Sequence, residues 1–126
     1  MKVYELNPAT VSRMARVDIA TLDRKPDGAM FEFHGCDCGV ASFVGQPPWE
    51  RHNGGDELLH ILAGECELTV LSDGGEESRL LHEGDVAVVP QGCWHRNNAA
   101  TGVTLLFMAP REGGENTWDD PRLQRP

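Results

Sequence analysis

Short apolar runs separated by turn-forming residues recur along the central part of the chain. These runs cover residues 29–34, 40–44, 58–62, 65–71, 79–82, 85–89 and 102–109. Runs of roughly four to eight residues rich in Val, Leu, Phe and Thr are typical of β-strands, and closely spaced turn signals between them are typical of β-sandwiches and barrels. The pattern therefore predicts an all-β fold, in which Asp73-Gly74 forms a tight hairpin turn.

The two ends of the chain have a different pattern. Residues 8–17 predict a short N-terminal helix, with Asn7 as its cap and Pro8 at the first helical position. Residues 111–126 predict an irregular C-terminal tail that lies over the barrel or against a second subunit. We therefore expect a single domain in three parts, which are an N-terminal segment (1–28) packing on the barrel, the β-barrel itself (29–110) and the tail (111–126).

Composition limits the class of partner. The 126 residues include 20 Asp and Glu against 11 Lys and Arg, which gives a formal net charge of −9. A nucleic-acid or anionic-membrane surface needs clustered basic residues, so we expect neither kind of partner. The N-terminus lacks the apolar run of a signal peptide, and no segment is apolar enough to span a membrane, so we expect a cytoplasmic protein. In that setting the four cysteines are interpreted as free thiols.

Histidine and glutamate concentrate in two segments, residues 49–64 and 84–95. Because side chains alternate along a strand, Glu50 and His52 share one face of the first segment. After the following turn, Glu57 shares a face with apolar residues, whereas His60 lies on the opposite face. An ionised glutamate beside apolar side chains costs free energy unless it is paired or binds a metal ion. This cost makes a metal site around Glu57 an attractive interpretation.

The same two segments resemble the motifs of the cupins, a family of small jelly-roll β-barrels. The first motif is G-x5-H-x-H-x(3,4)-E-x6-G, and the second is G-x5-P-x-G-x2-H-x3-N. The matching residues are His52, Glu57 and Gly64 in the first motif, and Gly84, Pro90, Gly92 and His95 in the second. The resemblance covers residues 47–99 in detail and implies that the all-β fold is a jelly-roll β-barrel.

Two positions depart from these motifs. Glu50 stands where the family has the first histidine of H-x-H, and Ala99 stands where it has the closing asparagine. The resemblance implies that His52, Glu57 and His95 bind one divalent metal ion, and Glu50 can add a fourth, carboxylate ligand. Iron, manganese, zinc and nickel all suit such a set, because first-row metals discriminate poorly by ligand type. The alternative is a polar pocket that binds no metal.

The resemblance implies a metal-dependent enzyme, similar to dioxygenases or isomerases, that acts on a small organic substrate. If Glu50 does not bind the metal, it is the candidate catalytic base. The alternative is a non-catalytic barrel that binds or senses a small molecule or a metal ion. Small cupins resemble one another in forming dimers, and apolar Leu58 and Leu62 beside His60 on the outer face agree with a homodimer.

The remaining candidates are interpreted mainly as structural residues. Trp49 and Trp94 directly precede candidate ligands and are expected to pack on the outer face, with a wall of the pocket mouth as the alternative. Cys93 is expected to fill space near the rim, with an oxidation-sensitive thiol or an accessory ligand as the alternatives. Strand alternation directs Arg51 and Arg96 away from the metal site.

Overall fold

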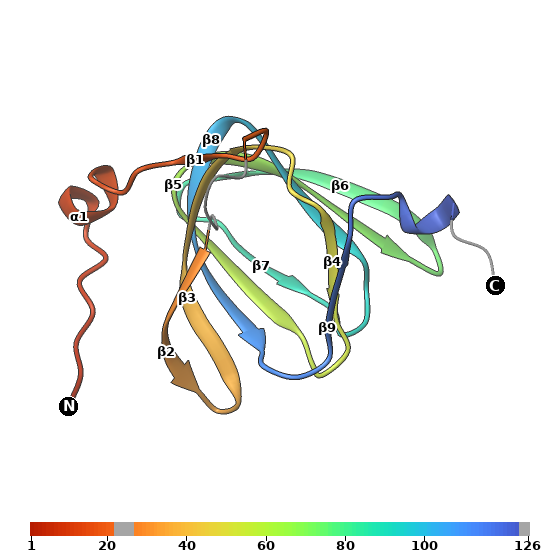
Figure 1. Cartoon of the computed structure of the whole chain (residues 1–126), viewed down its shortest axis with the longest axis horizontal. Coiled ribbons are helices and arrows are strands. Elements are labelled where there is room, and N and C mark those ends of the chain that lie inside the picture. Colours follow the sequence, from red (N-terminus) through yellow and green to blue (C-terminus); the bar gives the residue numbers. More distant parts are fainter. Residues whose placement is uncertain (22–26, 124–126) are drawn as a thin grey trace.

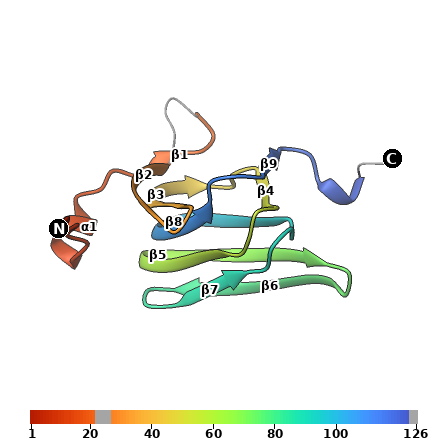
Figure 2. The ribbon, with the colours of Figure 1, turned by 90° about the horizontal axis from the view of Figure 1, so that it is seen from below.

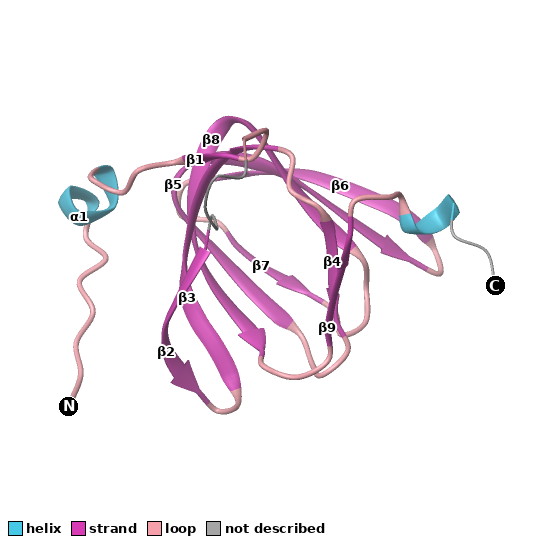
Figure 3. Cartoon of the chain, in the orientation of Figure 1, coloured by secondary structure: helices cyan, strands magenta, loops and turns pink. Residues whose placement is uncertain are grey.

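The computed structural model describes residues 1–21 and 27–123, and the regular secondary structure of this part of the chain is almost entirely β (Figures 1 and 3). The elements are α1 (Pro8–Ser12), β1 (Val17–Asp18), β2 (Asp27–Phe33), β3 (Cys36–Gly45), β4 (Trp49–His52), β5 (Glu57–Ser72), β6 (Gly75–His82), β7 (Val86–Val89), β8 (His95–Pro110), β9 (Gly114–Thr117) and the 3-10 turn η1 (Pro121–Leu123). The all-β prediction is confirmed.

The strands form one sheet that curls around an interior space (Figure 1). The long strand β8 lies at its centre, because it pairs with β3 along one edge and with β5 along the other. At its first residue, His95, β8 also pairs with Glu50 of β4, and β9 continues the sheet beyond β4. Figure 2 shows β5, β6 and β7 on one side of the molecule, with β3, β4 and β9 on the other. This arrangement is the predicted jelly-roll barrel.

A bend at Gly64 corrects one predicted boundary. The sequence pattern ends a strand at residue 62 and begins another at 65, but β5 runs without interruption from Glu57 to Ser72. Gly64 has a φ of 76°, and the register with β8 shifts between Gly64 and Glu67. The bend allows the first half of β5 to pair with β7 and the second half with β6. Gly64 therefore turns the strand instead of ending it.

Replacing Gly64 with alanine is expected to destabilise the fold by about 1–3 kcal/mol, the cost of holding a residue with a side chain in a disfavoured backbone conformation. An added Cβ would also meet the carbonyl oxygen of Gly102 and lie 2.9 Å from the Arg16 guanidinium. Urea unfolding measures the change. Gly74→Ala is the control, because the nearest atom to its added Cβ is 3.8 Å away. Equal losses of stability in the two variants would contradict this explanation of the bend.

The N-terminal helix begins as predicted but ends earlier. The Asn7 side chain accepts a hydrogen bond of 2.9 Å from the Thr10 backbone N–H, and Pro8 is the first helical residue. Helix α1 ends at Ser12 because the chain beyond it extends, and Val17 pairs with β3 in the parallel strand β1. The expected helix over residues 8–17 is therefore too long.

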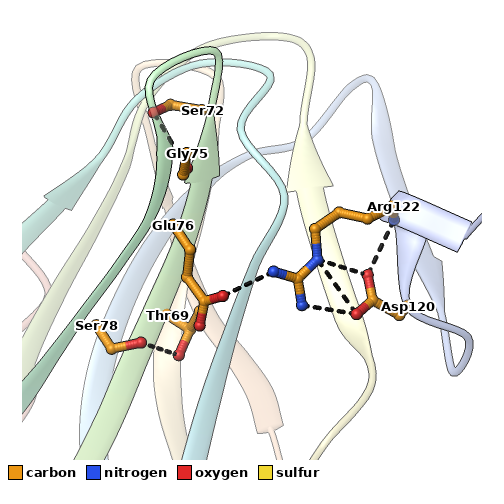
Figure 4. A network of polar contacts seen from close by, with 7 residues as sticks. All are labelled: Thr69, Ser72, Gly75, Glu76, Ser78, Asp120 and Arg122. Carbon is orange, nitrogen blue, oxygen red and sulfur yellow. Dashed lines mark hydrogen bonds and ion pairs between the residues drawn. The ribbon is translucent and has the colours of Figure 1, made fainter.

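The C-terminal tail is more regular than predicted. Residues 114–117 form β9, which pairs along its whole length with β4. Farther along, the Arg122 guanidinium forms ion pairs of 2.7 Å with Glu76 of β6 and with Asp120 (Figure 4). The tail therefore lies against the barrel, and the expectation of an irregular path is corrected for β9. The last three residues of the expected tail, 124–126, lie outside the described residues.

The core lies between the two sides of the curled sheet. Its buried residues are Ile19, Ala41, Phe43, Leu59, Ile61, Cys66, Leu68, Leu81, Val89, Ala99, Val103 and Leu105. All four cysteines have free thiols, as predicted, and burial raises the pKa of Cys66 to about 11. Within residues 1–21 and 27–123, no helix has the length and apolar character needed to cross a membrane.

Candidate metal centre

Four acidic and histidine side chains meet inside the barrel. Strand β4 contributes Glu50 and His52, which share a face, while β5 contributes Glu57 and β8 contributes His95. One potential ligand atom from each residue lies within 4.8 Å of those of the other three. The structure thus brings together all four residues that the sequence indicated as candidate ligands.

The spacing of these atoms suits a single ion. His95 Nε2 lies 2.8 Å from Glu57 Oε1 and 3.2 Å from Glu50 Oε1. His52 Nε2 lies 3.4 Å from Glu57 Oε2 and 3.8 Å from Glu50 Oε1. Bonds of about 2.0–2.2 Å from a metal to nitrogen and oxygen ligands place neighbouring ligand atoms about 3–3.5 Å apart. The four side chains therefore need only small adjustments to bind one ion together.

His52 provides the most specific evidence for a metal. Both of its ring nitrogens are buried and neither has a hydrogen-bond partner in the described structure, although Nε2 lies 3.4 Å from Glu57 Oε2 in an ion pair. A buried polar atom without a partner costs about 1–3 kcal/mol, so native structures rarely leave both nitrogens of an imidazole in this state. A metal ion bound to Nε2 would satisfy this nitrogen.

His95 is oriented by a backbone group that the sequence motifs do not mark. Its Nδ1 lies 3.2 Å from the carbonyl oxygen of Cys93, so Nδ1–H donates to this oxygen and Nε2 faces the two carboxylates. Histidines that bind metals are commonly held by such a hydrogen bond at the other ring nitrogen. The Cys93 side chain itself packs against the core, as the sequence interpretation favoured, and is absent from the ligand cluster.

The four groups shift one another's pKa values strongly. Burial opposes ionisation of Glu50, but interactions with the neighbouring His52 and His95 rings outweigh it and lower the pKa of Glu50 to about 2. Interaction with Glu50 and Glu57 raises the pKa of His52 to about 9. Burial lowers the pKa of His95, but the same carboxylates outweigh it and raise the value to about 10. Without metal, both histidines are therefore protonated at neutral pH.

A cavity of about 510 Å³ leads to this cluster. Its polar end contains Glu50, His52 and Glu57, and its apolar lining includes Phe43, Leu59, Leu105 and Phe107. The Glu50 side chain is 40% exposed and that of Glu57 only 4%, so a small molecule in the cavity meets Glu50 first. Leu59 belongs to the apolar floor that the strand pattern predicted.

The other candidate residues lie outside the cluster. His60 is half-buried on the opposite face of β5, as strand alternation predicted. The Arg96 guanidinium lies 4.9 Å from the ring centroid of Trp49, and the Arg51 guanidinium lies 4.6 Å from that of Trp94. Neither tryptophan lines the cavity, although Arg96 borders it. Outer-face packing is therefore the role that the structure supports for both tryptophans.

Two cavity residues were missed by the sequence interpretation. Asn116 and Trp118 both line the cavity, and both belong to the tail that was expected to be irregular. No motif marks them, because their position depends on the pairing of β9 with β4. The only sequence signal for their position would have been the alternation of side chains in a strand predicted over residues 114–117.

Comparisons with known proteins agree with this fold. The family model of the cupin domain matches residues 44–109. The sequence has no significant match among curated proteins. A Klebsiella pneumoniae protein with a double-stranded β-helix domain has a TM-score of 0.67 at 15% identity, covering 93% of this chain and 97% of its own.

Two further solved structures are similar. A cupin-2 domain protein from Shewanella frigidimarina has a TM-score of 0.57 at 19% identity, with 73% of this chain and 87% of its own covered. The hydroquinone 1,2-dioxygenase of a Sphingomonas species, solved with 4-hydroxybenzoate bound, has a TM-score of 0.60 at 17% identity, covering 79% of this chain and 69% of its own. At these identities the similarity shows a shared fold.

Proposed function

The chain belongs to the cupin domain family, and on this premise we propose that it is a metal-dependent enzyme of dioxygenase or isomerase type that acts on a small organic substrate. His52, Glu57 and His95 hold one divalent ion, with Glu50 as the fourth ligand. The observation that carries the proposal is His52, whose two buried ring nitrogens have no hydrogen-bond partner in the described structure. The similar fold of a hydroquinone dioxygenase supports the proposed reaction class.

Two imidazoles and two carboxylates form a ligand set that suits iron, manganese, zinc or nickel. When bound, the ion supplies Lewis-acid chemistry and, if it is iron or manganese, redox chemistry. The residues of the chain hold it and shape the cavity in front of it. Burial keeps Glu57 in place, the Cys93 carbonyl fixes the His95 ring, and Leu59, Leu105 and Phe107 exclude water from the cavity floor.

Glu50 has a second proposed role. Its carboxylate is the most exposed of the four groups and borders the cavity, so it is placed to accept a proton from a bound substrate. Its pKa of about 2 applies to the metal-free chain, in which both neighbouring histidines are protonated. Glu50 takes this role in place of the ligand role, if it does not bind the ion. This role gives a reason for a glutamate at the position where the family motif has histidine.

Substitutions at Glu50 test these roles. Glu50→His keeps a ligand at this position and is expected to retain the metal, whereas Glu50→Gln is expected to weaken metal binding because it removes the ligand's charge. Loss of proton transfer typically costs 10²–10⁴-fold in rate, so both variants are expected to lose turnover. Metal content is measured by elemental analysis, and turnover is measured as product formation or oxygen uptake with a panel of small organic compounds.

The same panel separates the enzyme from the alternative, a non-catalytic module. The panel is tested on protein loaded in turn with iron, manganese, zinc and nickel. If the protein binds one ion and a small molecule but converts none of the compounds with any of these metals, the result favours a binding or sensing role. Retention of full turnover by Glu50→Gln would contradict the role of Glu50 as a base.

A further inference from the structure

An uncovered indole ring lies at the edge of the cavity. Trp118 lines the cavity and is 53% exposed, although it directly follows a paired strand. In the register of β9 with β4, Asn116 lies opposite Glu50 and Thr117 opposite Trp49. Because side chains alternate along a strand, Asn116 shares the cavity face with Glu50, Thr117 points to the outer face, and Trp118 returns to the cavity face.

The three tryptophans differ in what covers their rings. Arg96 lies over Trp49 and Arg51 lies over Trp94. Among the described residues, no aromatic or cationic side chain stacks on Trp118. A large aromatic ring left uncovered beside a cavity is an apolar surface available to a ligand.

Asn116 adds a polar group beside this ring. Its side chain forms no hydrogen bond with any described residue, and it lines the same cavity. A side-chain amide offers two donors and one acceptor oxygen, so it can bind either a carbonyl or an N–H or O–H group. Together with the apolar lining, the wall formed by Asn116 and Trp118 suits a flat ring that carries one polar substituent.

We propose that Trp118 is a specificity-determining residue of the cavity, where its indole ring stacks on the aromatic body of a small ligand and Asn116 binds the ligand's polar group. This inference rests on the proposed function for the presence of a small-molecule ligand in the cavity. It extends that function by naming the ligand class, which is small aromatic compounds with one hydrogen-bonding substituent.

Arg122 is the residue that positions this wall. It ties η1 to Glu76 of β6 and to Asp120, and its guanidinium lies 5.8 Å from the Trp49 ring centroid (Figure 4). Trp118 lies between β9 and this anchored turn. The backbone on both flanks of Trp118 is therefore anchored to the barrel.

Arg122→Met is therefore expected to loosen the segment that carries Trp118. The heteronuclear NOE of the Trp118 indole N–H is expected to fall, while those of Trp49 and Trp94 change little. Arg79→Met is the control, because Arg79 lies on β6 but forms no ion pair with a described residue. An unchanged Trp118 signal in Arg122→Met would contradict the positioning role of Arg122.

The test of the ligand class compares benzamide with cyclohexanecarboxamide, which carries the same amide on a saturated ring. Each compound is titrated into the full chain, without metal and loaded with Zn²⁺, and the three indole N–H signals are followed by NMR. The Trp118 signal is expected to shift, with benzamide bound about two- to tenfold more tightly, the range that aromatic pairing supplies. Trp118→Leu should abolish this preference, whereas Trp118→Phe should keep part of it.

Trp94→Leu serves as the matched control and is expected to keep the full preference. Asn116→Ala is expected to weaken the binding of both amides by the same factor. Equal binding of the two amides, or an unchanged preference in Trp118→Leu, would overturn the inference. Metal binding is measured separately, so that a preference in a chain that binds none of Fe²⁺, Mn²⁺, Zn²⁺ and Ni²⁺ would leave the inference standing and remove the proposed metal function.

Discussion

Replacing His52 with alanine is expected to lower the affinity of the protein for divalent metal by more than about 100-fold. Loss of a residue that only supports a metal ligand already costs 10- to 100-fold, and His52 is itself a proposed ligand. Its ring nitrogens are buried, and Nε2 faces the Glu57 and Glu50 carboxylates at 3.4 and 3.8 Å, so removal of the ring leaves only three ligand side chains at the cluster. Competition against a chelator of known affinity, with Mn²⁺ or Zn²⁺, measures the change.

His60→Ala is the matched control for this variant. His60 lies on β5, the strand of Glu57, but on the opposite face, and it is absent from the ligand cluster. The His60→Ala variant is expected to bind metal as tightly as the unchanged protein. Equal affinities of the His52 and His60 variants would show that the cluster is not the metal site.

Raising the pH from 7 to 8 is expected to tighten metal binding by up to about 100-fold. The pKa values of about 9 for His52 and about 10 for His95 mean that both rings carry a proton throughout this range. A histidine must lose that proton before it binds a metal, and each proton released contributes about tenfold per pH unit. Calorimetry in two buffers of different ionisation enthalpy should detect about two protons released per ion at pH 7.

The folding stability of the metal-free protein is expected to fall as the pH rises, whereas its affinity for metal increases. Because the folded-state pKa values of His52 and His95 lie above the ordinary value of 6.5, their contribution to stability is fully present below pH 6.5 and is lost as the pH rises through 9 to 10. The lowered pKa of Glu50 contributes stability above pH 4.5, which is lost as the pH falls towards 2. A metal affinity that does not change between pH 7 and 8 would contradict the charged state of the two histidines.

Strand alternation explains why Glu50, His52 and Glu57 were predictable from the sequence, whereas His95 was indicated by the resemblance to the second cupin motif. Glu50 and His52 are two residues apart, so one strand places both on the same face. Glu57 follows a short turn, and its face is identified by the buried Leu59 and Ile61 that alternate with it. These are local relations, and neither depends on which strands pair. The curled sheet then brings His95 of β8 opposite Glu50.

The features that were missed depend on long-range pairing. Gly64 bends β5 because the strand changes its partner from β7 to β6, and a glycine by itself also predicts the end of a strand. In strand β9 only Thr117 favours β-structure, while Gly114, Glu115 and Asn116 do not, and the segment forms a strand because β4 offers it a free edge. The position of Trp118 at the cavity follows from that pairing and from the Arg122 contacts that anchor the next turn. The expected homodimer remains a prediction.

The number of divalent ions bound per chain is the most direct test of the proposed site. The protein is stripped with a chelator, incubated in turn with Fe²⁺, Mn²⁺, Zn²⁺ and Ni²⁺ at pH 8, freed of excess ion and analysed for metal content. One equivalent of at least one of these ions is predicted for the unchanged chain, with loss of that ion in His95→Ala while circular dichroism shows an intact β-fold. A folded chain that retains none of the four ions, or a His95→Ala variant that retains the full equivalent, would contradict metal binding at this cluster.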